Sequence, residues 1–331
     1  MNLNTKIYVA GHCGLVGSAL TRNLWAQGYT NIVARTHAEL DLTNRVATEA
    51  FFVAEKPEFV FLAAAKVGGI LANNIYPADF ISINLAIQSN VIQASYRNDV
   101  QRLLFLGSSC IYPRDCPQPI KEEYFLSGSL EPTNRPYAVA KIAGIEQCWS
   151  YNRQYGSQFL AVMPTNIYGR GDNYDLVNTH VIPALIRKCH EAKICGGNEI
   201  IVWGTGTPKR EFLNSDDLAD ASIFLMCLPD EKYSSLVNPQ SILPPIINIG
   251  CGEDLSIREL AKIIKQVVGF QGKITFDSSK PDGTPRKLLD SNEINKLGWR
   301  PKIGLPDGIT KSYEDFLQKF SPLSQDIGSV S

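Results

Sequence analysis

Tyr137 and Lys141, four residues apart, are the first candidates for chemistry in this 331-residue sequence. In a helix this spacing places both side chains on one face. The lysine ammonium would there stabilise a phenolate and lower the tyrosine pKa from its usual value of about 10. Such a pair recurs by chance, but Ser108 supplies a hydroxyl directly after the apolar segment 102–106. The three residues together indicate proton exchange with a bound oxygen near neutral pH.

A glycine-rich turn lies near the start of the sequence, after the apolar segment 6–10. Its residues follow a G-x-x-G-x-x-G pattern: Gly11, His12, Cys13, Gly14, Leu15, Val16 and Gly17. Glycines at these positions permit a tight turn and close approach of the backbone to a pyrophosphate. The helix that follows offers free N–H groups and a positive dipole end to phosphates. This position favours a dinucleotide-binding turn over a purely structural one.

The end of the second expected strand, 31–34, bears on the choice between NAD and NADP. An acidic residue there would bind the ribose 2′-hydroxyl, whereas a basic one can meet a 2′-phosphate. This sequence has Arg35 and no carboxylate before Glu39. It therefore favours NADP(H), with Arg35 as the phosphate partner. The alternative is a solvated arginine at a strand end.

Apolar segments at 6–10, 31–34, 59–63, 102–106 and 159–163 alternate with helical patterns at 15–27 and 83–97. Strands this apolar are buried on both faces, which predicts a Rossmann-like, doubly wound parallel sheet in an α/β fold. We expect a dinucleotide-binding domain over 1–166, joined by returning segments at about 211–228 and 246–250. A smaller α/β substrate domain is expected over 167–210 and 251–331, with helices at 179–192 and 256–268.

Composition excludes several classes of protein. The sequence is 44% hydrophobic and 20% charged with a formal net charge of −1, which is typical of a globular protein without a general nucleic-acid-binding surface. It has no apolar run of 18 residues and no signal peptide, so we expect no membrane association. The eight cysteines form no C-x-x-C pair. This pattern predicts reduced thiols in a cytoplasmic protein without a metal site.

The spacing of the glycines and the order of Ser108, Tyr137 and Lys141 resemble the short-chain dehydrogenase/reductase superfamily. In that superfamily the tyrosine exchanges a proton while a hydride moves at the adjacent carbon. A narrower resemblance spans nearly the whole chain. Segments 62–70, 107–113, 136–144, 163–166, 202–204, 210–213 and 280–287 are similar to those of the GDP-L-fucose synthase family.

That resemblance implies 3,5-epimerisation of GDP-4-keto-6-deoxy-D-mannose, followed by reduction at C4 with NADPH to give GDP-L-fucose. Tyr137, Lys141 and Ser108 would serve the reduction, whereas Cys110 and His180 would act as the acid/base pair of epimerisation. A thiol needs surroundings that favour its thiolate for this role. Cofactor contacts fall on residues 11–17, Arg35, Leu106, Gly107, Ser108, Ser109, Lys141, Pro164, Thr165, Asn166, Ile167 and His180. Substrate contacts fall on Lys188, Trp203, Arg210 and Asp282.

Without the resemblance, several of these residues have simpler roles. His180 would be a helix cap or surface group, Cys110 a packing residue, Lys188 a solvated lysine and Trp203 a core side chain. The family also implies a homodimer paired through helices of the N-terminal domain.

The sequence departs from the family at Cys13. Many members have an arginine there that helps to hold the cofactor 2′-phosphate, and some also have arginine in place of His37. The departure leaves more of the phosphate contact to Arg35. It predicts weaker discrimination between NADPH and NADH than is usual in the family.

Four other functions compete with this interpretation. Sugar-nucleotide 4,6-dehydratases have a Thr-Asp-Glu set where this sequence has Ser108-Ser109-Cys110, and a 4-epimerase has no evident use for Cys110 with His180. A reductase of a related GDP-4-keto sugar stays open, because pocket shape sets that choice. A nicotinamide-binding regulator without turnover has no need to keep both Tyr137 and Lys141.

Overall fold

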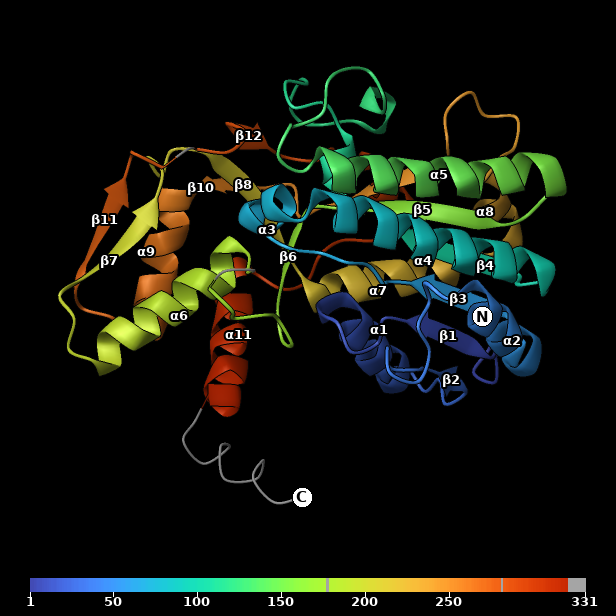
Figure 1. Cartoon of the computed structure of the whole chain (residues 1–331), viewed down its shortest axis with the longest axis horizontal. Helices are drawn as coiled ribbons and strands as arrows, with labels where there is room; N and C mark the ends of the chain where they lie inside the picture. The colour runs from blue at the N-terminus through green and yellow to red at the C-terminus, as the bar shows by residue number, and fades with distance from the viewer. Residues whose placement is uncertain (177–178, 281, 321–331) are drawn as a thin grey trace.

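The larger sheet has six parallel strands in the order β2 (Ile32–Val33), β1 (Ile7–Ala10), β3 (Phe59–Leu62), β4 (Arg102–Leu106), β5 (Phe159–Pro164) and β9 (Ile246–Ile249). The computed structural model describes residues 1–176, 179–280 and 282–320 (Figure 1). The strand order reverses between β1 and β3, and ligands of such sheets bind outside the carboxyl ends at that point. The predicted doubly wound α/β fold is confirmed.

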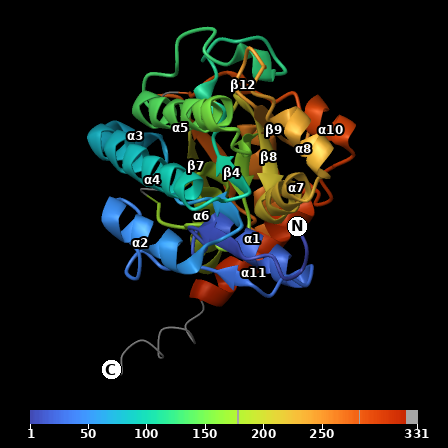
Figure 2. The ribbon, with the colours of Figure 1, turned by 90° about the vertical axis from the view of Figure 1, so that its right-hand side faces the viewer.

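Helices cover both faces of this sheet, as Figure 2 shows from one end. On β1, Ile7 and Val9 face a core shared with α1 (Leu15–Ala26) and α7 (Ser215–Met226). Tyr8 and Ala10 face the opposite core, shared with α2 (Arg45–Glu55), α4 (Pro77–Arg97) and α5 (Arg135–Tyr155). This alternation explains why the strand is apolar at every position. The short helices are α3 (Ile70–Ile75), α8 (Asp230–Leu236), α10 (Asn292–Leu297), η1 (Ser109–Ile111) and η2 (Glu122–Tyr124).

The predicted strands and helices match the observed ones to within a few residues, with one exception. The helix expected over 83–97 begins six residues earlier, at Pro77. Proline suits the first turn because the N–H that it lacks would have no partner inside the helix. None of the helices in the described residues is long and apolar enough to cross a membrane.

A smaller lobe lies beside the carboxyl ends of the large sheet (Figure 1). It contains a sheet with the path β10 (Asp254–Ser256), β8 (Lys209–Asn214), β12 (Arg286–Lys287), with β6 (Asn166–Tyr168) also paired to β8. A second pair joins β7 (Glu199–Trp203) to β11 (Lys273–Asp277). Helices α6 (Val181–Ile194), α9 (Ile257–Val268) and α11 (Leu305–Phe320) enclose its core.

The segments expected to return to the large sheet do so only in part. Strand β9 pairs with β5, and α7 packs against α1. Residues 211–214, by contrast, belong to β8 in the smaller lobe. The domain boundaries themselves stay a prediction, and part of the predicted substrate domain, residues 177–178, 281 and 321–331, lies outside the described residues.

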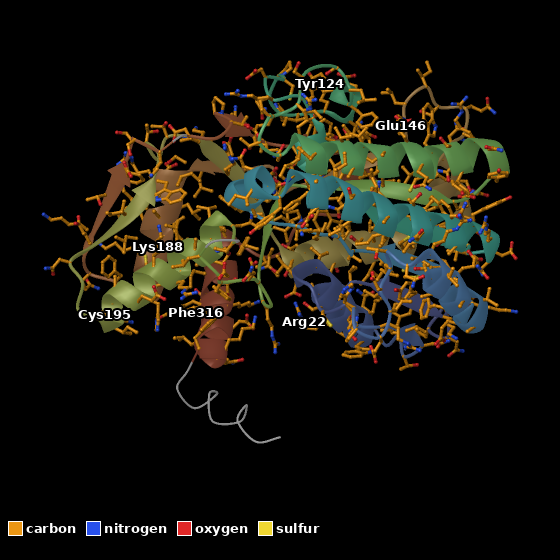
Figure 3. All side chains as sticks on the ribbon, viewed as in Figure 1. Arg22, Tyr124, Glu146, Lys188, Cys195 and Phe316 are labelled. Atoms are coloured by element: carbon orange, nitrogen blue, oxygen red, sulfur yellow. The ribbon has the colours of Figure 1, made fainter. Side chains whose placement is uncertain are left out.

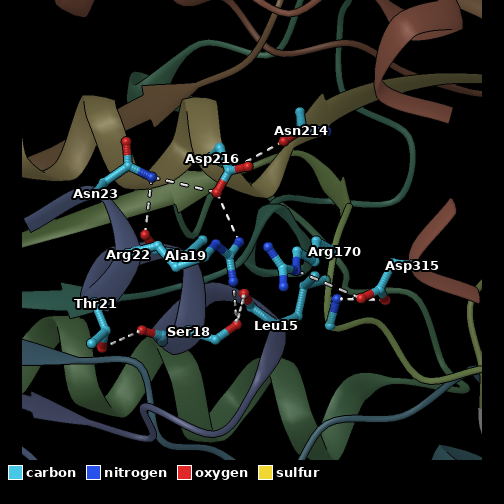
Figure 4. A network of polar contacts seen from close by, with 12 residues as sticks. Leu15, Ser18, Ala19, Thr21, Arg22, Asn23, Arg170, Asn214, Asp216 and Asp315 are labelled. Carbon is cyan, nitrogen blue, oxygen red and sulfur yellow. Dashed lines mark hydrogen bonds and ion pairs between the residues drawn. The ribbon is translucent and has the colours of Figure 1, made fainter. Parts of the chain in front are cut away.

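Polar contacts fix helix α1, which begins at the glycine turn (Figure 4). Arg22 on α1 donates from Nη2 to Asp216 on α7 at 2.8 Å and from Nη1 to Ser18 at 3.2 Å. Beside it, Arg170 lies 3.8 Å from Asp315 on α11. The network therefore ties the predicted phosphate-binding helix to α7 and lies next to the loop that leads into the smaller lobe.

A fully buried glutamate, Glu211 on β8, joins the two lobes. Its carboxylate accepts the N–H of Gly252 at 2.8 Å and that of Leu289 at 3.0 Å. Its backbone carbonyl accepts the side chains of Thr165 and Asn166, at 3.2 and 2.8 Å. Burial raises the pKa of Glu211, and the hydrogen bonds oppose that rise. One residue thus connects the ends of β5 and β9 to the strands of the smaller lobe.

We predict that Glu211→Gln lowers the free energy of unfolding by about 1–3 kcal/mol, because the amide directs an NH2 group at one of two N–H donors. Urea denaturation measures the change. The control is Glu253→Gln, an exposed site in the adjoining loop, where surface substitutions alter stability by about 0.5 kcal/mol or less. Equal stability of the Glu211 variant and the wild type would show that the contact between the two lobes does not depend on this carboxylate.

Candidate active site

The proposed Ser–Tyr–Lys set meets at the carboxyl end of β4. Ser108 follows that strand, and its Oγ accepts the N–H of Cys110 at 3.2 Å as η1 begins. Tyr137 lies in the first turn of α5 and Lys141 one turn later. The buried Lys141 Nζ donates to the carbonyl of Leu106 at 2.7 Å and lies 5.8 Å from the centroid of the Tyr137 ring. The strand therefore positions the lysine beneath the tyrosine.

The electrostatics of Tyr137 differ from the sequence-based expectation. Burial and the neighbouring Cys110 raise the pKa of Tyr137, and a hydrogen bond with Ser108 only partly opposes this. Burial also lowers the pKa of Lys141 to about 7. The prediction that the tyrosine pKa would be lowered is wrong for this structure, because desolvation of the phenolate dominates. Tyr137 therefore holds its proton at neutral pH.

Two side-chain donors lie against the Cys110 sulfur. Asn134 donates from Nδ2 to the Cys110 Sγ at 3.3 Å, and the Lys287 Nζ lies 3.6 Å from the same sulfur. Arg210 is close enough that the Cys110 and Asp282 charges partly offset the lowering of its pKa by burial. Sequence reasoning missed Asn134 and Lys287, although Lys287 ends the quoted segment 280–287.

His180 is the residue that precedes α6, and its side chain makes no capping hydrogen bond. Among the described residues the imidazole has no hydrogen-bond partner, so the structure does not join it directly to Cys110. Desolvation by the protein atoms around the ring lowers the pKa of His180, which favours the neutral imidazole at neutral pH. The role of a cap, one simpler explanation of this histidine, finds no support.

The glycine turn fits a dinucleotide. Gly11 has a φ of +87°, and a Cβ there would lie 2.7 Å from the backbone N of Ala64. A Cβ on Gly17 would overlap the Gly11 carbonyl. Gly14 precedes α1 without a side-chain cap, which leaves the N–H groups of the first turn available for phosphates. The Nδ1 of His12 is buried without a partner, as expected of a group that awaits a ligand.

The remaining predicted cofactor residues lie at the same edge of the sheet. Residues 106–109 begin with the last residue of β4, and residues 164–167 run from the end of β5 into β6. Because parallel strands share their carboxyl edge, both segments lie on the side of the sheet where β1 ends at the glycine turn. Their contacts with a cofactor stay a prediction.

Arg35 already has partners in the structure. Its Nη2 lies 2.6 Å from Glu55, and its Nη1 donates to the carbonyl of Ala34 at 2.8 Å. Glu55 also pairs with Lys6 at 2.8 Å. Contact between Arg35 and a 2′-phosphate stays a prediction, and the Glu55 carboxylate opposes it by neutralising part of the arginine charge.

Three of the predicted substrate residues lie near the end of β7. Lys188, on α6, donates to the carbonyl of Ile201 at 3.1 Å and lies 6.0 Å from the ring centroid of Trp203 (Lys188 is labelled in Figure 3). Asp282 accepts the N–H of Thr205 at 3.0 Å and holds the turn after β7. Trp203 is 59% exposed, so it is not a core residue.

No metal-binding group of three or more His, Cys, Asp or Glu occurs in the part of the chain that the structure describes.

The fold and this site define a nucleotide-sugar enzyme of the extended short-chain dehydrogenase/reductase type. The chain belongs to the NAD dependent epimerase/dehydratase family, whose model matches residues 7–250. It is 56% identical to GDP-L-fucose synthase 1 of Arabidopsis thaliana over 315 residues, covering 95% of this chain and 94% of that protein.

Two solved structures are similar along almost their whole length. A GDP-6-OMe-4-keto-L-xylo-heptose reductase from C. jejuni is 42% identical with a TM-score of 0.91, covering 96% of this chain and 99% of that one. A GDP-L-fucose synthetase from Naegleria fowleri bound to NADP is 26% identical with a TM-score of 0.84, covering 97% of each chain.

We predict that Lys287→Met slows alkylation of Cys110 by iodoacetamide at pH 7 by about tenfold, since the ammonium stabilises the reactive thiolate. Mass spectrometry of the peptide that contains Cys110 follows the reaction separately from the other cysteines. Lys296→Met, on exposed α10, is the matched control and should leave the rate unchanged. An unchanged rate in the Lys287 variant would remove this lysine from the thiol's environment.

We also predict that Cys13→Arg increases the preference for NADP⁺ over NAD⁺ by about tenfold, because an arginine in the glycine turn adds a charge-assisted bond to the 2′-phosphate. Calorimetric dissociation constants for both cofactors measure it. Cys195→Arg makes the same charge change at the far end of α6 (Figure 3) and should not alter the ratio. If the wild type already discriminates as strongly as the Cys13 variant, another group holds the phosphate.

Proposed function

We propose that this chain converts GDP-4-keto-6-deoxy-D-mannose to GDP-L-fucose, with epimerisation at C3 and C5 followed by NADPH-dependent reduction at C4. The observation that carries the proposal is a second acid/base centre beside the Ser–Tyr–Lys set. Cys110, with Asn134 and Lys287 against its sulfur, lies within two residues of Ser108. A simple ketone reductase needs only Tyr137, Lys141 and Ser108. The high identity to a GDP-L-fucose synthase supports the same reaction.

Epimerisation begins with proton loss from a carbon beside the 4-keto group. Cys110 is the base, because Lys287 and Asn134 stabilise its thiolate. His180 exchanges the proton on the opposite face as its acid/base partner. In its protonated form His180 donates that proton, and the lowering of its pKa by desolvation makes the imidazolium a stronger acid. Arg210 lies near Cys110 and adds positive charge where the enolate oxygen develops.

Reduction follows at the same carbonyl. NADPH, held at the glycine turn and the ends of β4 and β5, supplies the hydride. Tyr137 donates its proton to the C4 oxygen, and its raised pKa keeps that proton in place until the oxygen becomes basic. Ser108 hydrogen-bonds the same oxygen. Lys141, fixed by Leu106, stabilises the phenolate that remains.

The GDP portion of the substrate binds to Lys188, Trp203, Arg210 and Asp282. Arg210 has the right chemistry for a phosphate or sugar oxygen, since it is partly buried and its charge interacts with those of Asp282 and Cys110. Asp282 supports the site through the turn at Thr205. We further propose a cytoplasmic homodimer that pairs through helices of the N-terminal domain, on the strength of the family resemblance.

A second candidate is an epimerase/reductase or C4 reductase of a related GDP-4-keto sugar. The 42% identity to a heptose reductase with a TM-score of 0.91 favours this alternative. Both candidates share Tyr137 and Lys141 but differ in the substrate pocket, and a C4 reductase without epimerase activity would not need Cys110.

Two variants separate the half-reactions. We predict that Tyr137→Phe slows NADPH oxidation by about 10²–10⁴-fold but leaves part of the solvent deuterium exchange into the substrate, because exchange needs Cys110 rather than the phenol. Cys110→Ser should suppress exchange first. Cys195→Ser, at an exposed thiol, serves as the control for both assays.

Nuclear magnetic resonance at C3 and C5 and absorbance of the reduced nicotinamide give the two readouts. Normal exchange in the Cys110 variant would exclude it from epimerisation. Unaltered turnover in the Tyr137 variant would contradict the reductase mechanism and favour a regulator that only binds nicotinamide.

A further inference from the structure

A small cavity adjoins Cys110 where the two lobes meet. Its volume is about 30 Å³, whereas a buried water molecule needs about 10–15 Å³ and at least two polar partners. Buried and exposed side chains both line the cavity, so it extends from Cys110 toward the surface. The lining residues that concern the thiol are Cys110, Glu131, Asn134 and Lys287, with the exposed Arg114 and Arg286 beside them.

Asn134 connects the thiol to this cavity. Its Nδ2 donates to the Cys110 Sγ at 3.3 Å. Its Oδ1 is buried and has no hydrogen-bond partner among the described residues. Most buried polar atoms have a partner in the protein or in ordered water, so an orphaned oxygen calls for an explanation. Here the oxygen belongs to a residue that lines a space large enough for one water molecule.

Glu131 brings a carboxylate to the same cavity. Its Oε2 accepts the hydroxyl of Thr133 at 2.5 Å and the N–H of Asn134 at 3.1 Å. These two bonds fix the carboxylate just before α5 begins and next to the asparagine that contacts the thiol. Sequence reasoning gave Glu131 no role.

A double epimerisation with one thiol base requires that the thiol be reset. Removal of the first proton turns the Cys110 thiolate into a thiol, while His180 delivers a different proton to the opposite face of the sugar. Cys110 has to lose its proton before it can act as the base at the second carbon. That proton has to reach the solvent while the sugar still covers the site.

We propose that the cavity is the exit by which the Cys110 proton reaches the solvent, and that Glu131 accepts it. The S–H bond breaks as a bridging water passes a proton to the Glu131 carboxylate, which leaves a thiolate and a carboxylic acid. The carboxylic acid then returns its proton to bulk water, so no other reactant is consumed. The Lys287 Nζ, 3.6 Å from the sulfur, stabilises the thiolate that the transfer leaves. The inference rests on the proposed function, because only a double epimerisation requires this reset.

The test is Glu131→Gln in the full chain. The amide keeps an oxygen that can accept the bonds from Thr133 and Asn134, but it cannot take up the proton. Enzyme in excess over GDP-4-keto-6-deoxy-mannose in D2O, without NADPH, makes each molecule act once, and nuclear magnetic resonance follows C3 and C5 separately. The carbon that reacts first should take up deuterium at the wild-type rate. The second should be slower by about tenfold, less than the usual loss of a general base because solvent still reaches the cavity.

Two further variants complete the test. Glu131→Asp keeps a carboxylate and should recover part of the rate at the second carbon. Glu123→Gln removes the same charge from an exposed residue of η2, between η1 and α5, and should match the wild type at both carbons.

A wild-type rate at the second carbon in the Glu131→Gln variant would overturn the proposal. Equal slowing at both carbons would overturn it too, because it would mean that the substitution displaces the thiol itself. A wild type that takes up no deuterium at C3 and C5 would instead contradict the proposed function.

Discussion

The buried carboxylate of Glu211 is the contact on which the geometry of the site depends. It holds the loop after β9 and Leu289, two residues after β12, while its backbone holds Thr165 and Asn166 at the end of β5. The neighbouring residue on β8, Arg210, pairs in register with Lys287 on β12. The contact between the lobes at Glu211 therefore brings two cations of the smaller lobe, Arg210 and Lys287, to Cys110, which belongs to the larger lobe. A carboxylate without these donors would be too costly to bury.

Burial also divides the chemistry between the two acid/base sets. Desolvation raises the pKa of Tyr137 and lowers those of Lys141 and His180. The phenol consequently keeps its proton for the final step, whereas the imidazolium of His180 gives up its proton more readily. Cys110 has two donors, Lys287 and Asn134, at its sulfur. One site thus places the phenol of the reduction close to a second acid/base group, as an epimerisation followed by a reduction requires.

Much of this could be predicted from the sequence, because local patterns determine it. Apolar strands, the glycine turn and the four-residue spacing of Tyr137 and Lys141 all act over short distances along the chain. The contact between Lys287 and Cys110 could not be predicted, since it spans 177 residues and depends on how the two lobes pack together. The engagement of Arg35 by Glu55 and the direction of the Tyr137 pKa shift were missed for a similar reason. Both depend on what surrounds a charge after folding, and neither spacing nor residue type shows that.

The most direct test of the account is to add the protein to GDP-4-keto-6-deoxy-mannose and NADPH, follow the loss of reduced-nicotinamide absorbance, and identify the product sugar. The account predicts oxidation of NADPH with GDP-L-fucose as the product, which requires both acid/base sets in one site. Oxidation that yields an unepimerised sugar such as GDP-rhamnose would contradict the roles given to Cys110 and His180. No oxidation at all would contradict the choice of substrate and turn attention to other GDP-4-keto sugars.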